Sequence, residues 1–477
     1  MIFFINVLEY VVNMKKIVSM LLVLVMLLGL TACANQQTQQ PAAQNTQSDT
    51  TKTEAPKTDA DAVQTEEPEQ TVTISYLSRY TNPEVPRHKF FLDKLEEFRA
   101  LYPNIIVEDV SIAEADSYKS TLRASVAAGT APTLFICSDA FPHLEWASNG
   151  VMSDLTPILE SSDWEGPTDP AVLESFSFEN EGLDGVYGVP NGVVNSPVYV
   201  NTKLLKQYNL ETPQTWEEVV AMAEVLKAAD PEIIPFSVSA KTTSDLGRFF
   251  SEFVVRMYGL EFRDKFIAHE VKWTDPEMIQ ALEKFKELID MGIFGPDAVS
   301  FDTDSNVAKF GEGKVAMLFT ATWFWDRFNG FDFADEIDCV NFPYFENAPE
   351  NKDIWFATTS EGFCISAPVG SPEYEAAGKL LNFMLSKSTF EQYASEIAKG
   401  GIYPLEIDFD LSAASHPMST FMEGYATRSA TTDIIGTYMN NSGVLNITNT
   451  ELQTLFVGQD VQTVAENLQA QYDELFQ

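Results

Sequence analysis

The sequence predicts an α/β protein whose body is divided into two lobes. The chain continues for about 400 residues after residue 70, which is too long for one ordinary core and makes two lobes the default. From Thr71 to Cys137, strand-like and helix-like segments alternate, which is typical of a parallel sheet with right-handed crossovers. A second series of strands and helices begins near Val198.

The first series contains three short strands separated by two helices. The strands are expected over 71–77, 105–110 and 133–137, and the helices over 88–102 and 118–128. Phe91, Leu95 and Phe98 repeat at helical spacing in the first helix, and Gly129 stops the second. Ligands of such sheets collect where strands end, so the segments 78–80 and 138–141 are candidate binding loops.

The second series has longer helices. Thr215 and Glu218 form a capping box that begins a helix extending to Lys227. Further helices are expected over 276–291 and 461–476, and strands over 198–200, 315–320 and 340–344.

The N-terminal segment predicts export. Lys15 and Lys16 precede an apolar run, 17–30, which is shorter than the roughly 20 residues needed to cross a bilayer. Ala32-Cys33 then resembles a bacterial lipobox, in which the cysteine is acylated and the signal is cut before it. Residues 1–33 are therefore expected to be a lipoprotein signal peptide that starts naturally at Met14. The alternative is an uncleaved anchor helix.

Residues 34–70 are rich in Gln, Thr, Ala, Asp and Glu and contain one large apolar residue, Val63. Such a stretch buries too little apolar surface to offset the entropy of ordering. It is expected to be a disordered tether that holds the body away from a membrane, to which Cys33 anchors it through two or three acyl chains.

The charge of the chain argues against one class of partner. The formal net charge is −40 and there is no Lys/Arg cluster, so nucleic-acid binding is not expected.

The cysteines cannot all form disulfides. With Cys33 assigned to lipid, three cysteines remain, so no complete disulfide framework exists. They are expected to be buried free thiols, with a Cys339–Cys364 bridge between neighbouring strands as the alternative.

No motif indicates catalysis. The four histidines are scattered without metal-ligand spacing, and there is no G-x-S-x-G element. The segment 311–314 is not a phosphate-binding loop, because its glycines are too close together. We therefore expect a non-enzyme with no cofactor and no metal. A secreted carbohydrate-active enzyme or a surface adhesin lipoprotein remains the alternative, since some carboxylate pair at glycosidase separation could arise among 70 acidic residues.

Six segments, in order, resemble the family 1 extracellular solute-binding proteins, the sugar-binding lipoproteins of ABC importers. They span most of the chain from Thr71 to Gln477, and each is weak alone. The segments are 131–136 (APTLFI), 185–190 (GVYGVP), 198–205 (VYVNTKLL), 210–218 (ending TWEE), 310–317 (FGEGKVAM) followed by Trp323, and 362–365 (GFCI) with 376–385. The sequence departs from the family pattern at Ala321-Thr322, where a small residue and proline are usual.

The resemblance implies a periplasmic-binding-protein-like fold, in which each lobe is a mostly parallel sheet flanked by helices and the ligand cleft lies between lobes. The chain would cross between lobes near Ser196-Pro197, near Glu361-Gly362 and after Pro404. The first lobe would comprise 71–196 and 365–404, and the second 197–364 and 405–477. The implied function is to bind a sugar or oligosaccharide as a monomer and deliver it to the ABC permease in the membrane.

Sugars are bound by aromatic stacking and by bidentate polar side chains. Trp323 follows a strand and matches the stacking tryptophan of the family, with a core tryptophan as the alternative and Trp325 as a substitute. The remaining candidates are polar or aromatic residues near strand ends and crossings, namely Asp139, Tyr80, Asn191, Asn195, Glu361 and Tyr403. Each has a structural alternative, such as a helix cap for Asp139, a loop aromatic for Tyr80 and turn residues for the asparagines. Arg79 and Arg248 are each expected to be a surface salt-bridge residue, with contact to a charged sugar as the alternative.

Overall fold

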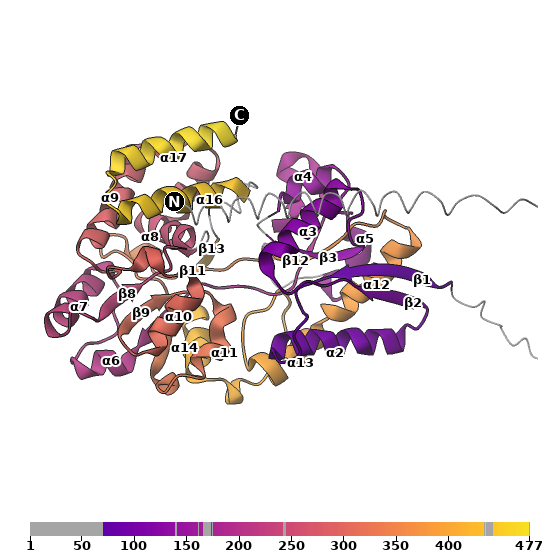
Figure 1. The fold of residues 1–477 in the computed structure, drawn as a ribbon, viewed down its shortest axis with the longest axis horizontal. Coiled ribbons are helices and arrows are strands. Elements are labelled where there is room, and N and C mark those ends of the chain that lie inside the picture. Colours follow the sequence, from indigo (N-terminus) through magenta and orange to yellow (C-terminus); the bar gives the residue numbers. More distant parts are fainter. Residues whose placement is uncertain are drawn as a thin grey trace, which may run out of the picture. The chain divides into compact units, whose positions relative to one another are not determined.

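The computed structural model describes residues 70–138, 141–160, 162–165, 173, 175–241, 245–359, 361–433, 435 and 442–476 (Figure 1). The expected signal peptide with Cys33, nearly all of the expected tether, and Asp139 lie outside these residues. Within the described ranges, no helix has the length and apolar character required to cross a membrane.

The first lobe is built on a five-stranded sheet. Its strands follow the order β2 (Ile105–Asp109), β1 (Val72–Leu77), β3 (Leu134–Cys137), β12 (Gly362–Ile365) and β6 (Val189–Pro190). β1 pairs in parallel with β2 and β3, which confirms the alternation of strands and helices predicted at the start of the body. β12 runs antiparallel to both β3 and β6.

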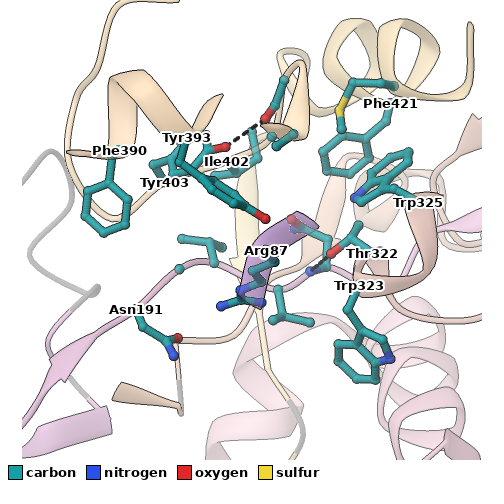
Figure 2. Close-up of a pocket in the computed structure, with 18 of the residues that line it drawn as sticks. Arg87, Asn191, Thr322, Trp323, Trp325, Phe390, Tyr393, Ile402, Tyr403 and Phe421 are labelled. Atoms are coloured by element: carbon teal, nitrogen blue, oxygen red, sulfur yellow. Dashed lines mark hydrogen bonds between the residues drawn. The ribbon is translucent and has the colours of Figure 1, made fainter. Parts of the chain in front are cut away.

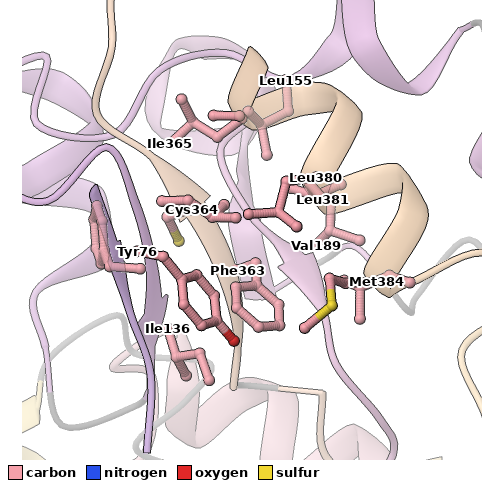
Figure 3. Close-up of a cluster of buried hydrophobic side chains, with 14 of the residues drawn as sticks. Tyr76, Ile136, Leu155, Val189, Phe363, Cys364, Ile365, Leu380, Leu381 and Met384 are labelled. Carbon is pink, nitrogen blue, oxygen red and sulfur yellow. The ribbon is translucent and has the colours of Figure 1, made fainter. Parts of the chain in front are cut away.

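The helices α2 (Pro86–Leu101), α3 (Ala115–Ala127) and α12 (Pro372–Met384) pack on this sheet. α2 begins with Pro86 in its first turn, where the missing N–H costs nothing. Figure 3 shows the core between sheet and helices, where Tyr76 and Phe363 stack and Leu380, Leu381 and Met384 of α12 approach them. The remaining elements of this lobe are α4 (His143–Ser148), α5 (Thr156–Leu159), α13 (Lys387–Tyr393), β4 (Ser177–Phe178) and β5 (Leu183–Val186).

The second lobe is built on a four-stranded sheet, in the order β10 (Ile337–Val340), β7 (Val198–Asn201), β9 (Val315–Phe319) and β8 (Ile234–Ser237). β8 and β9 are parallel, whereas β7 runs antiparallel to both of its neighbours, a departure from the mostly parallel sheet that the resemblance implied. The reason is local: the chain enters β7 beside the end of β9, where Val198 pairs with Phe319, so β7 must run the other way.

This sheet has a core on each face, because successive side chains of a strand point to opposite sides. Val198 and Val200 belong to one cluster and Tyr199 to the other. The capping box predicted at Thr215 and Glu218 is present. The helices are α6 (Thr202–Gln207), α7 (Trp216–Ala229), α8 (Asp245–Ile267), α9 (Pro276–Asp290), α10 (Thr303–Gly311), α11 (Trp325–Phe328), α14 (His416–Tyr425), α16 (Ser442–Phe456) and α17 (Val461–Leu475). A separate parallel pair consists of β11 (Ile354–Phe356) and β13 (Ala430–Thr432).

One expectation about this region is wrong, whereas the expected buried free cysteines are confirmed. The strand expected over 340–344 lies earlier, as β10, and Tyr344 makes only an isolated bridge with Thr215. The apolar character of this segment reflects core packing instead, since Phe342 and Phe345 are buried in the loop after β10. The alternative bridge between Cys339 and Cys364 is excluded, because the two cysteines lie in different sheets and both are free.

In the described part of the chain, three segments connect the lobes. The first follows β6 and the second precedes β12, and they pair with each other through two hydrogen bonds between Val194 and Thr358, of 2.8 and 2.9 Å. β12 joins the first sheet from Gly362 onward, three residues before the expected boundary. The third segment follows Tyr403, and Leu405 still packs in the core of the first lobe.

Candidate functional site

The edges of the two sheets place polar residues between the lobes. β6 lies parallel to β3, so Asn191, which follows β6, lies at the edge where β1 and β3 also end. Glu361 precedes the antiparallel strand β12 and reaches the same edge. In the second lobe, the end of β9 and the start of β7 share one edge, which brings Thr322 to Asn195.

A cavity of about 120 Å³ lies between these edges (Figure 2). It is lined from the first lobe by α2, α13 and the loop over 400–403, from the second by the turn after β9, α11 and α14, and from the crossing by 191–195. The described lining residues are Arg87, Phe91, Asn191, Gly192, Val193, Val194, Asn195, Thr322, Trp323, Trp325, Phe390, Tyr393, Ala398, Gly400, Gly401, Ile402, Tyr403, Met418 and Phe421. Typical ligand pockets measure about 300–1,000 Å³, so lobes or side chains must move to admit a larger ligand.

Tyr80 does not line the cavity but holds two residues that do. Its hydroxyl accepts hydrogen bonds of 3.2 Å from Arg87 Nη2 and 3.2 Å from Asn191 Nδ2. Its ring is buried and stacks on Phe91 at 4.6 Å, and burial raises the pKa of its phenol. Tyr80 is therefore a core residue whose hydroxyl orients the polar groups of the cavity.

Asn191 links the crossing segment to Glu361. Its Nδ2 also donates to Glu361 Oε1 at 3.0 Å, and its backbone N–H donates to the Glu361 carbonyl at 3.2 Å. Glu361 is half-buried and does not line the cavity. Both candidates thus lie in one polar cluster with Tyr80, and only Asn191 reaches the cavity surface.

Asn195 is almost fully buried and connects the lobes. Its Nδ2 donates to the Phe356 carbonyl at 2.5 Å. Its backbone N–H donates to Thr322 Oγ1 at 3.2 Å, and its carbonyl accepts from the Thr322 N–H at 2.9 Å. These bonds engage the amide of Asn195 in fixing the crossing, so its contribution to the cavity is mainly structural.

Trp323 presents an open aromatic surface. It is 47% exposed and lies in the short turn that follows β9. The Arg248 guanidinium carbon lies 5.0 Å from its ring centroid. Arg248 is not the surface residue that the sequence suggested: its side chain is buried, and Nη1 pairs with Asp245 Oδ1 at 3.1 Å.

Trp325 and Tyr403 line the cavity in more constrained positions. Trp325 is half-buried and meets Phe421 edge-on at 5.3 Å. The Tyr403 hydroxyl donates to the Gly400 carbonyl at 2.9 Å, and its ring packs against Phe390 at 5.6 Å. Both residues form the aromatic wall of the cavity. Asp139, the remaining candidate, lies outside the described residues.

Several lining residues were not anticipated from the sequence. Arg87 lies in the first turn of α2, four residues before the buried Phe91, and therefore on the same face of the helix. The four-residue spacing between Arg87 and Phe91 could therefore have placed Arg87 on the inward face of the helix. Tyr393 and Phe421 come from segments far along the chain, and no local pattern places them here. In the part of the chain that the structure describes, no cluster of His, Cys, Asp or Glu could hold a metal ion.

Known proteins with similar sequences include extracellular and periplasmic binding proteins. An uncharacterized ABC transporter extracellular-binding protein of Pyrococcus horikoshii is 24% identical over 276 residues, which are 57% of this chain and 61% of the relative. A protein of Rhizobium meliloti named "Probable sugar-binding periplasmic protein" is 32% identical over 110 residues, 23% of this chain and 25% of the relative. The chain thus matches less than two thirds of the length of these relatives.

Solved structures share the fold. A chitin oligosaccharide binding protein superposes with a TM-score of 0.74 at 20% identity, covering 85% of this chain and 99% of that protein. The maltose-bound MalE3 of T. maritima gives a TM-score of 0.65 at 20% identity, covering 84% and 99%. Both likenesses support the two-lobed α/β architecture.

The family model for bacterial extracellular solute-binding proteins matches residues 82–389, well over half of the chain. Its members bind solutes and are not enzymes. The chain therefore belongs to the bacterial extracellular solute-binding protein family.

Proposed function

We propose that this protein is the lipid-anchored, extracellular binding component of an ABC importer. It binds a sugar or oligosaccharide between its lobes as a monomer and delivers it to the membrane permease. The family match, the names of the ABC and sugar-binding relatives, and the cavity between the lobes support this proposal.

The observation that carries the ligand class is the exposure of Trp323. Of the seven tryptophans, five are buried and Trp325 is half-buried, whereas Trp323 is 47% exposed. An open indole face beside a cavity is what the apolar C–H faces of a sugar ring require. On the opposite lobe, the guanidinium of Arg87 adds donors for sugar oxygens, and Oδ1 of Asn191 adds an acceptor for sugar hydroxyls, since its Nδ2 already donates to Tyr80 and Glu361.

Binding is coupled to closure of the lobes in this proposal. The first lobe comprises 71–196 and 362–404, and the second comprises 197–361 and 405–477. The boundary expected at residue 365 moves to residue 362, because β12 begins there. The paired crossings at Val194 and Thr358 form the hinge. A ligand that touches Arg87 and Trp323 together favours the closed state, whereas one that touches a single lobe does not.

The anchor is Cys33, and residues 34–70 act as the tether. The apolar run before Cys33 and the polar composition after it support this assignment. An anchored binding protein keeps its ligand close to the permease, because the tether limits the volume in which the body moves.

A thermal-shift screen of the purified protein against a panel of mono-, di- and oligosaccharides tests the ligand class. A ligand at about 100 times its Kd adds roughly 2.7 kcal/mol to the free energy of unfolding. The hits should bind without being hydrolysed, and deletion of the gene should abolish cellular uptake of the same sugar. A panel without any stabilising sugar contradicts the proposed ligand, and turnover of a hit contradicts the importer role.

A further inference from the structure

One charged side chain, Arg87, is found among the described residues that line the cavity. The other described lining residues are aromatic, aliphatic, small or uncharged polar, and none is a carboxylate. This departs from the composition of the chain, which has 70 Asp and Glu against 30 Lys and Arg. The described wall of the cavity therefore carries a positive charge within a strongly acidic protein.

Among the described residues, Arg87 lacks the carboxylate partner that most of the other arginines have. Five other arginines lie within 4.0 Å of a carboxylate oxygen, namely Arg99, Arg248, Arg256, Arg263 and Arg327. In the described ranges no such ion pair involves Arg87. Its Nε is buried and has no hydrogen-bond partner, although a buried guanidinium N–H without an acceptor is costly.

The position of the guanidinium is nevertheless fixed. Nη2 donates to the Tyr80 hydroxyl at 3.2 Å, and the guanidinium carbon lies 5.6 Å from the Tyr80 ring centroid. Figure 2 shows Arg87 between Asn191 and Trp323, with Tyr393 next to it. The hydroxyl of Tyr80 thus fixes Nη2 of the guanidinium, while the Nε–H group makes no hydrogen bond.

The guanidinium also remains charged. Burial lowers the pKa of Arg87, but Tyr80, Tyr393 and Glu361 raise it by more, so the pKa lies above its ordinary value. The Glu361 carboxylate is the acidic group of this cluster, and its Oε1 accepts from Asn191. Glu361 therefore opposes an anion at Arg87 without neutralising it through a direct ion pair.

We propose that the ligand is an acidic sugar whose carboxylate binds Arg87 through Nε and the adjacent Nη. This inference rests on the proposed function and specifies its substrate class. A planar guanidinium and a carboxylate match in geometry, and their two parallel hydrogen bonds supply the missing acceptor for Nε. The sugar ring then stacks on Trp323, and Oδ1 of Asn191 remains available to accept hydrogen bonds from hydroxyl groups.

Titration calorimetry with matched probes tests the proposal on the mature protein. The pairs are digalacturonate and its methyl ester, cellobiouronate and cellobiose, and xylobiose with and without a glucuronate branch. In the pair that binds best, the acid should bind more tightly than its neutral counterpart. Arg87→Gln should weaken binding of the acid by about 10- to 150-fold, as expected for a hydrogen bond to a charged group, and leave the neutral member within a few-fold.

Three further variants sharpen the result. Arg87→Lys keeps the positive charge but lacks the planar pair of N–H donors, and should retain part of the preference for the acid. Glu361→Gln removes the opposing charge while keeping an acceptor for Asn191, and should strengthen binding of the acid. Arg99→Gln changes an arginine in the last turn of α2 that does not line the cavity, and should change neither affinity.

Equal affinity for acid and neutral members, or an equal loss of both in Arg87→Gln, overturns the acidic-sugar inference and leaves the proposed function intact. Melting temperatures of all variants show whether a loss of binding reflects unfolding. If no sugar binds, either in these pairs or in the broader thermal-shift panel, the proposed function fails, and this inference fails with it.

Discussion

The indole ring of Trp323 lies against the guanidinium of Arg248, with 5.0 Å between the ring centroid and the guanidinium carbon. Arg248 is itself held by Asp245, whose second carboxylate oxygen accepts from Thr303 Oγ1 at 2.5 Å. A chain of buried polar contacts thus supports an aromatic residue that remains 47% exposed. This arrangement fixes the orientation of the ring before a ligand arrives, which reduces the entropy lost on binding.

Replacement of Trp323 by alanine should weaken sugar binding by about 1.5–3 kcal/mol, because it removes a large stacking surface. The melting temperature should change little, since nearly half of the residue is already in solvent. Val457→Ala, at an exposed site outside the cavity, is the control. Unchanged affinity together with a stability loss of about 3–5 kcal/mol would assign Trp323 to the core and leave Trp325 as the stacking candidate.

Replacement of Arg248 by methionine should lower both stability and affinity. It leaves the buried Asp245 carboxylate without its cationic partner, which costs about 3–5 kcal/mol of folding free energy. The double variant Arg248→Met/Asp245→Asn should recover much of the stability but not the affinity, because the support of Trp323 is still missing. Denaturant unfolding and calorimetry separate the two effects, and full recovery of affinity would show that Arg248 acts on the fold alone.

Glu252 should make stability depend on pH. Its carboxylate is buried within 3.2 Å of Arg256 Nη2, yet neither oxygen has a hydrogen-bond partner, and burial raises its pKa to about 7. The unfolded state has a pKa of about 4.3, so the folded state binds more protons between these values. Stability contributed by this group is present below about pH 4 and is lost as pH rises towards 7.

The matched variant is Glu252→Gln, which mimics the protonated carboxyl. From pH 5 to pH 8, the variant should gain stability relative to wild type. The gain in its relative free energy of unfolding should be a few kcal/mol at most. Denaturant titrations at a series of pH values measure it. A difference that stays constant across this range would mean that Glu252 is ionised throughout.

Replacement of Cys33 by alanine should release the body into the medium or leave an unprocessed precursor. The prediction follows from the lipobox-like sequence, in which the cysteine is both the cleavage site and the acylation site. Cell fractionation and the apparent size of the product provide the measurement. Membrane retention at the normal processed size would contradict the lipoprotein assignment.

Local patterns in the sequence predicted the elements whose neighbours are close in the chain. β1, β2 and β3 follow from apolar runs separated by amphipathic helices, and the cap at Thr215 follows from its spacing to Glu218. The strand expected over 340–344 was misplaced because Phe342 and Phe345 are buried by tertiary packing and not by strand pairing. A local pattern cannot distinguish these two causes of apolar character.

The cavity was predictable only in part. Trp323 lies directly after a buried strand, so its place at a strand end could be inferred. Arg87 and Phe421 meet there because two lobes approach each other, which no spacing along the chain encodes. The same holds for Tyr80, whose ring is in the core while its hydroxyl orients two cavity residues.

The late position of β12 in the chain has a consequence for biosynthesis. Its partners β3 and β6 are complete by Pro190, but β12 begins at Gly362 and lies between them. At about 5–20 residues per second, roughly 10 to 30 seconds of synthesis separate these strands. A first sheet that formed within that interval would keep unpaired strand edges, which invite aggregation. The order of strands thus delays completion of the amino-terminal lobe until most of the polypeptide has been made, and folding of the two lobes becomes coupled in time.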